Sequence, residues 1–134
     1  MFVDASALVA ILTREPEVDA LADLLEAADA PITSAIAVFE TVAGVCRKRQ
    51  VSVADAQEAV RALLTTAGVA VVPITDEDGA IALDAFARFG RGRGHPAQLN
   101  LGDCFAYALA RRHNAPVLCK GDDFRATDIA VAGM

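Results

Sequence analysis

Short apolar segments alternate with longer segments of helical periodicity along the whole 134-residue chain, and this alternation limits the fold more than any other feature. Strands joined through helices form right-handed crossovers, which build a parallel sheet covered on both faces. We therefore expect one domain, residues 1–134, with an α/β fold in three layers and a central parallel β-sheet of about five short strands. The expected strands are residues 1–4, 31–33, 69–73, 116–119 and 129–131.

Capping residues and breaking residues set the bounds of the expected helices. Ser34, Ser52 and Thr75 are good N-caps ahead of apolar residues at helical spacing. The continuous apolar run at 69–73 is typical of a strand buried on both faces. The Gly-rich segment 90–100 is the one long loop expected. The expected helices cover residues 5–12, 16–30, 35–49, 53–67, 76–89 and 101–112.

Composition indicates a compact intracellular protein. Hydrophobic residues make up 54% of the chain, which excludes disorder, and the formal net charge of −6 by itself argues against a polyanionic partner. The three cysteines lack the spacing of zinc or redox sites, so we expect reduced thiols. The N-terminus has no basic start, and its apolar run is too short to span a membrane. We expect a cytoplasmic protein without membrane contact.

Several acidic residues lie in apolar surroundings, where an isolated carboxylate is costly to bury. Asp4 follows the first strand, Glu40 lies in VFETVAGV, and Asp103 lies in LGDCFAYALA. Asp122 and Asp123 follow the strand at 116–119. Ligands of parallel sheets bind at the carboxyl ends of the strands, so these acids can converge there. Each acid also has a structural explanation: helix caps for Asp4 and Asp103, a solvated helix face for Glu40, and a turn for Asp122.

Converging carboxylates need protonation or a cation. Oxygen ligands without Cys or His favour Mg²⁺ or Mn²⁺ over zinc. Two such ions would neutralise four carboxylates, and a pair about 4 Å apart suits in-line attack on phosphorus. Hydrolysis of a phosphodiester is therefore the chemistry that this acidic pattern favours.

The whole chain resembles the PIN-domain family, and within it the VapC ribonuclease toxins of bacterial toxin–antitoxin pairs. The resemblance rests on the order and spacing of four strings: VDASALVAIL, TSAIAVFET, GRGRGHPAQLNLGDCFAYALA and VLCKGDDFRATDI. It implies a PIN-like parallel sheet and cleavage of RNA as an endonuclease with Mg²⁺ or Mn²⁺. It also implies a VapB-type antitoxin as partner, and a homodimer.

The resemblance also assigns residues. Asp4, Glu40 and Asp103 match the three firmest acidic metal positions of the family. The fourth is Asp122, with Asp123 as the alternative, because this chain reads KGDDF where many members carry T-x-D. Ser6 matches the small hydroxyl residue beside the first acid, where it would orient that acid or contact phosphate.

The arginines of the Gly-rich loop have two interpretations, and the sequence also allows other functions. Arg91 and Arg93 could contact RNA phosphate, or they could belong to a solvated loop. The cations at residues 47–49 and 111–113 end helices, where they favour the dipole. The alternative function is a catalytically silent PIN-like module that binds RNA or protein. A phosphoacceptor domain of receiver type would need an acid after the strand at 69–73, which ends in Pro73, Ile74 and Thr75 instead.

Overall fold

A parallel four-stranded sheet forms the centre of the computed structural model, which describes residues 1–134. The strand order is β3-β2-β1-β4, and every pair is parallel, as predicted. The strands are β1 (Phe2–Val3), β2 (Ile32–Ser34), β3 (Ala70–Val72) and β4 (Val117–Leu118). The helices are α1 (Ala5–Leu12), α2 (Val18–Ala27), α3 (Ala35–Arg49), α4 (Val53–Ala67), α5 (Asp76–Phe89), α6 (Leu101–Arg112) and the short 3₁₀ helix η1 (Phe124–Ala126).

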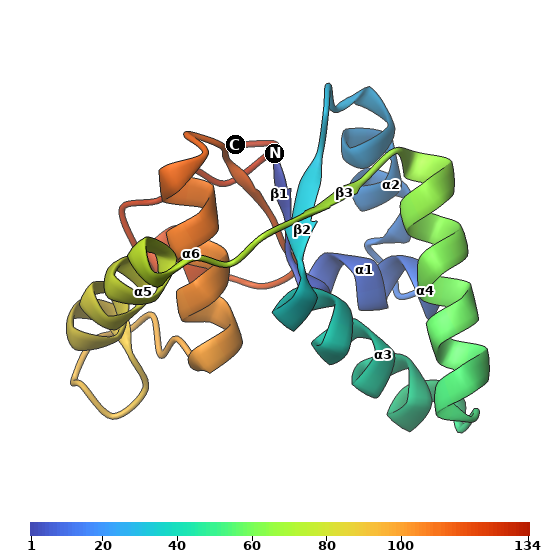
Figure 1. The fold of residues 1–134 in the computed structure, drawn as a ribbon, viewed down its shortest axis with the longest axis horizontal. Coiled ribbons are helices and arrows are strands. Elements are labelled where there is room, and N and C mark those ends of the chain that lie inside the picture. The colour runs from blue at the N-terminus through green and yellow to red at the C-terminus, as the bar shows by residue number, and fades with distance from the viewer.

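The sheet separates two apolar cores, because consecutive residues of a strand face opposite sides. Phe2 and Val117 pack with residues of α5 and α6, whereas Val3 and Leu118 pack with residues of α1, α2 and α4. Figure 1 shows α5 and α6 on one side of the strands and α1 to α4 on the other. The expected arrangement in three layers is confirmed.

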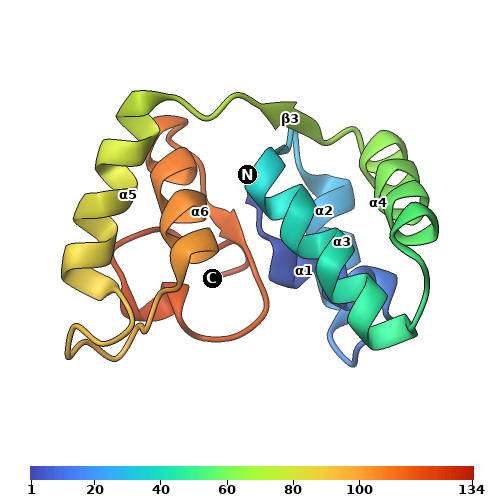
Figure 2. The same cartoon turned by 60° about the horizontal axis from the view of Figure 1, so that its bottom comes forward.

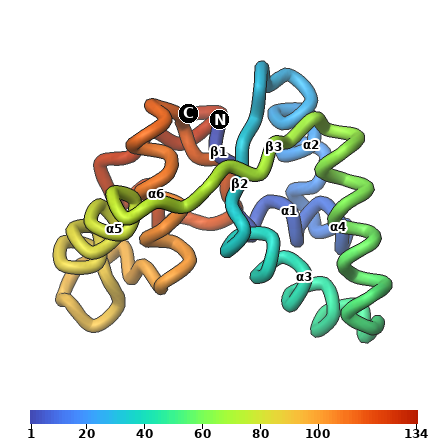
Figure 3. The backbone as a smooth tube through the Cα atoms, viewed as in Figure 1, coloured from blue at the N-terminus to red at the C-terminus, as the bar shows by residue number.

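Two strand predictions are corrected by the structure. β3 is an edge strand with β2 as its one neighbour, and Val71 is 46% exposed, so the run at 69–73 is not buried on both faces. From β3 the chain crosses to the side of α5 (Figures 2 and 3), and no further strand pairs with β3. Residues 129–131 contribute a single bridge, from Val131 to Val117, and the sheet therefore has four strands.

Close packing of α1 against α3 fixes the edge of the sheet where β1 and β2 end. Each helix follows its strand directly, and Thr33 donates a hydrogen bond of 2.8 Å to the carbonyl of Val3. A Cβ on Gly44 of α3 would lie 2.9 Å from Cγ2 of Val9 of α1, which is too close. Glycine therefore permits the close approach of α3 to the middle of α1. No α-helix in the structure is both long and apolar enough to cross a membrane.

Candidate active site

A cavity of about 450 Å³ at the carboxyl edge of the sheet brings together three of the predicted acids, Asp4, Glu40 and Asp103. They come from three elements distant in sequence: the end of β1, the middle of α3 and the first turn of α6. The other residues that line this acidic cavity are Ala5, Ser6, Val9, Glu15, Phe39, Ala43, Gly44, Arg47, Lys48, Asn100 and Lys120.

Asp4 is the most enclosed of the three, with 4% of its surface exposed. Its Oδ2 accepts hydrogen bonds from the backbone N–H of Ser6 at 3.0 Å and from the Ser6 hydroxyl at 2.5 Å. Burial raises the pKa of Asp4, while these hydrogen bonds act in the opposite direction. Asp4 is thus both the N-cap of α1 and a wall of the acidic cavity, so the structural and functional explanations do not compete.

Asp103 is oriented by a capping box at the start of α6. Its Oδ2 accepts from the backbone N–H of Asn100 at 3.1 Å, and its own N–H donates to Asn100 Oδ1 at 2.8 Å. Oδ1 of Asp103 accepts no hydrogen bond from the protein and stays free to bind a ligand. Burial raises the pKa of Asp103 to about 6, and the charges of Asp4 and Asp123 act in the same direction.

Glu40 is held against the start of α6 by the absence of a side chain at Gly102. A Cβ at residue 102 would collide with both carboxylate oxygens of Glu40. Burial raises the pKa of Glu40 to about 7, with further contributions from the charges of Asp4 and Asp103. The three acids therefore act on one another electrostatically, as side chains sharing one site do.

The chemistry of this donor set fits a divalent cation. None of Asp4, Glu40 and Asp103 forms a salt bridge, so no cationic side chain is in contact with them. No three such side chains lie close enough together to hold an ion as they stand, so binding requires the carboxylates to draw inward. Oxygen donors of this kind suit a hard cation.

The two acids after β4 are placed differently from each other. The Asp122 side chain is 88% exposed, lies 3.5 Å from Arg125, and does not line the acidic cavity. The charge of Asp123, in contrast, raises the pKa of Asp103. Asp123 is exposed as well and does not line the acidic cavity either, so this electrostatic effect, and no contact, favours it over Asp122.

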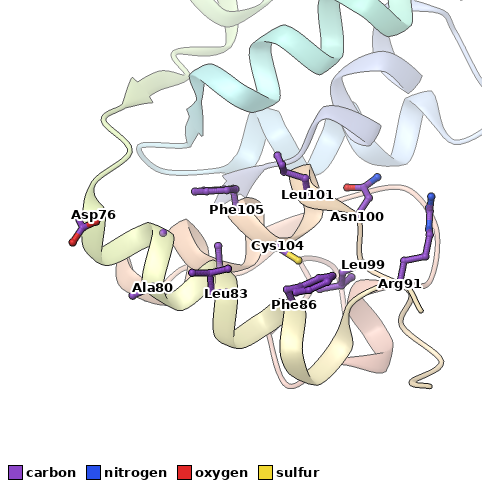
Figure 4. A pocket seen from close by; sticks show the side chains of 12 residues that line it. Asp76, Ala80, Leu83, Phe86, Arg91, Leu99, Asn100, Leu101, Cys104 and Phe105 are labelled. Atoms are coloured by element: carbon purple, nitrogen blue, oxygen red, sulfur yellow. The ribbon is translucent and has the colours of Figure 1, made fainter. Parts of the chain in front are cut away.

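The two loop arginines also differ. The charge of Arg91 lowers the pKa of Asp103, whereas the guanidinium of Arg93 stacks over the ring of Phe86 at 5.7 Å. Figure 4 shows Arg91 near Asn100 at one end of an apolar cavity of about 610 Å³ between α5 and α6. Of the two, only Arg91 is placed to act on the acids.

At the far end of α6 the arginines have structural partners. Arg112 binds the fully buried Asp78, which also caps α5 through Thr75. Arg111 lies 2.9 Å from Asp128, whose other oxygen accepts from the Tyr107 hydroxyl at 2.6 Å. These contacts join α6 to neighbouring segments. The sequence analysis interprets the two arginines as structural cations, and the structure adds their partners.

Sequence reasoning missed several residues that surround the acids. The spacing of Asn100 and Asp103 is that of a capping box and could have been found. Lys48 reads as a helix-end cation, and Glu15 as a solvated acid before a proline, so neither gives a signal. Lys120 stands out in the sequence only because it begins KGDDF, where many family members carry Thr, although it lines the acidic cavity.

Comparison with known proteins agrees with the fold and with the family resemblance of the sequence. The family model described as PIN domain matches residues 1–130. A VapC ribonuclease of Rhizobium meliloti is 40% identical, with 96% of this chain and 98% of the relative covered. Ribonuclease VapC of Mycolicibacterium smegmatis is 43% identical, with 97% and 98% covered. The crystal structure of Mycobacterium tuberculosis VapC20, a toxin that cleaves the sarcin–ricin loop, superposes with a TM-score of 0.77 at 19% identity over 96% of this chain and 95% of that one.

The family match over residues 1–130 defines this chain as a PIN domain. The identities of 40% and 43% over nearly the full length place the chain with the VapC proteins. The chain belongs to the PIN domain family and, within it, to the VapC group. The VapC20 structure independently supports the fold.

Proposed function

We propose that the protein is an endoribonuclease that uses Mg²⁺ or Mn²⁺ and acts as the toxin of a type II toxin–antitoxin pair, with residues 1–134 forming one PIN domain. The observation that carries the proposal is the single cavity that Asp4, Glu40 and Asp103 line together, with no salt bridge to any of them. Relatives named VapC ribonuclease, 40% and 43% identical, support the RNA substrate.

In this proposal Asp4, Glu40 and Asp103 hold the cation, with Asp123 as the fourth acid in preference to Asp122. A divalent ion bound there would supply the positive charge that phosphodiester hydrolysis requires. Ser6 fixes the orientation of Asp4, and Asn100 fixes that of Asp103. Arg91 is the loop residue best placed to contact an RNA phosphate, and Arg93 is not needed for it.

We also propose two protein partners, a VapB-type antitoxin and a second copy of this chain. Phe39 is 76% exposed and Leu101 is 68% exposed, and both line a further apolar cavity that continues from Glu40. Large exposed apolar side chains that cluster in this way are typical of surfaces covered by protein. The three free thiols support a place in the cytoplasm, where thiols stay reduced.

The experiment that tests the function is cleavage of total cellular RNA by purified, antitoxin-free protein with Mg²⁺ or Mn²⁺. We expect endonucleolytic products that disappear with EDTA and in the Asp103→Asn variant, which removes one charge with little change of shape. Cleavage that survives both treatments would refute the metal mechanism. RNA that is bound but never cut would favour the silent module instead.

A further inference from the structure

A second charged cluster lies on the rim of the acidic cavity, beside the three acids. The carboxylate of Glu15 binds the ammonium groups of both Lys48 and Lys120. The Glu15 side chain is 12% exposed, whereas those of Lys48 and Lys120 are 43% and 37% exposed. The lysines therefore keep open surface while Glu15 holds them together.

This cluster continues away from the acids into an adjoining cavity of about 840 Å³. Glu15, Lys48 and Lys120 line both cavities, so the two spaces are contiguous. Five cations border the two cavities. Besides Asp4, Glu40 and Asp103 in the first cavity, the acids near these cations are Glu15, which lines both cavities, and Glu17, which lies 3.7 Å from Lys120. The five cations are Arg14, Arg47, Lys48, Arg49 and Lys120.

The helix dipole does not account for this gathering. It favours cations in the last turn of α3, which explains residues 47–49. Arg14 and Lys120, however, belong to the segments after α1 and after β4. Three segments that are separate in sequence thus contribute cationic side chains to one place, although the net charge of the chain is −6.

Lys120 is also tied directly to the acids. Its backbone N–H donates to the Ser6 hydroxyl at 3.0 Å, and that hydroxyl donates to Asp4 at 2.5 Å. The cationic cluster therefore begins two hydrogen bonds away from the centre of the acidic cavity. A nucleic-acid backbone with one phosphate at the acids has neighbouring phosphates that must lie along the protein surface. This rim offers them a positively charged path.

We propose that Lys48 and Lys120, bridged by Glu15, begin a phosphate-binding track along which the backbone of single-stranded RNA leaves the acidic cavity toward Arg49 and Arg14. The inference rests on the proposed ribonuclease function and adds the side of the acidic cavity on which the RNA backbone is bound. Contacts of this kind position the backbone and read no bases. Glu15 offsets part of the positive charge and competes with phosphate for both lysines.

The test is binding of a fluorescein-labelled single-stranded oligouridine to the full-length protein in Ca²⁺, followed over a range of salt concentrations. Lys48→Gln and Lys120→Gln should each weaken binding about 2- to 5-fold and lower the slope of log affinity against log salt by about 0.7. Glu15→Gln should act in the opposite direction, with tighter binding and an undiminished slope. The matched control is Arg61→Gln, an exposed arginine on α4 that should change neither quantity.

The opposite signs expected for Glu15 and the lysines separate the track from simple loss of folding, which would weaken binding in every variant. Unchanged slopes for Lys48→Gln and Lys120→Gln, with RNA still cleaved in Mg²⁺, would overturn the track and leave the proposed function intact. A larger loss of slope in Arg91→Gln than in either lysine variant would place the path on the loop instead. Wild-type protein that cleaves cellular RNA but binds no oligouridine would likewise overturn the track and leave the proposed function intact.

Discussion

Replacing Glu40 by Gln should stabilise the protein in the absence of metal, although it removes a proposed ligand. The pKa of Glu40 is raised from 4.5 to about 7 in the folded protein, so its ionised form is disfavoured there. That rise corresponds to at most about 3 kcal/mol. Because the side chain is partly exposed and its neighbours can relax, we expect about 1–2 kcal/mol for the substitution.

The sign of the effect follows from proton binding. Between about pH 4.5 and about pH 7 the folded state holds a proton on Glu40 that the unfolded state has lost, so wild-type stability falls as the pH rises through this window. Glu40→Gln lacks this group. The variant should match wild type near pH 4 and exceed it at about pH 8, where its melting temperature should be about 4–8 °C higher.

Thermal unfolding in EDTA and in Mg²⁺ measures this directly. The control is Glu58→Gln, an exposed glutamate on α4, which should leave stability unchanged at both pH values. Mg²⁺ should raise the melting temperature of wild type more than that of Glu40→Gln, because a cation that binds the folded state stabilises it. A Glu40→Gln variant less stable than wild type at about pH 8 in EDTA would refute the account in which burial, and then the charges of Asp4 and Asp103, disfavour the ionised form of Glu40.

Three further substitutions test separate parts of the structure. Gly102→Ala should leave the melting temperature close to wild type but reduce RNA cleavage at least about tenfold, since the new methyl group displaces the Glu40 carboxylate; full activity would show that this close approach is unimportant. Asp123→Asn should lower cleavage by about tenfold while Asp122→Asn changes it less than about threefold, and the reverse order would restore Asp122 as the fourth acid. Asp78→Asn should cost about 3 kcal/mol in urea unfolding, because it leaves a guanidinium of α6 without its buried partner; a loss below about 1 kcal/mol would contradict this.

Local rules predicted the helices and the order of layers well. Ser34, Ser52 and Thr75 cap their helices as expected, and each cap hydrogen bond depends only on residues three positions away. The exposure of β3 could not be predicted in the same way. Whether a strand lies at the centre or the edge of a sheet is decided by which strands pair with it, and the run at 69–73 carries no signal for that.

The candidate site, like the fold, could be predicted from the sequence only in part. Asp4, Glu40 and Asp103 stand out in sequence because each interrupts an apolar segment, and the fold brings them into one cavity. The contact of Glu15 with two lysines joins segments far apart in the chain, so no spacing in the sequence predicts it. The net charge is misleading for a similar reason. It sums charges over the whole chain, so it does not show that acids gather in one cavity and cations on its rim.

The central claim is that a divalent cation bound by Asp4, Glu40 and Asp103 enables this chain to cut RNA. The most direct measurement follows Mn²⁺ binding by electron paramagnetic resonance and RNA cleavage in the same samples, for wild type and for Asp103→Asn. We predict that both signals rise at the same Mn²⁺ concentration in wild type and that both are lost together in the variant. Cleavage that proceeds without bound Mn²⁺, or a variant that still cuts after losing the ion, would contradict the account.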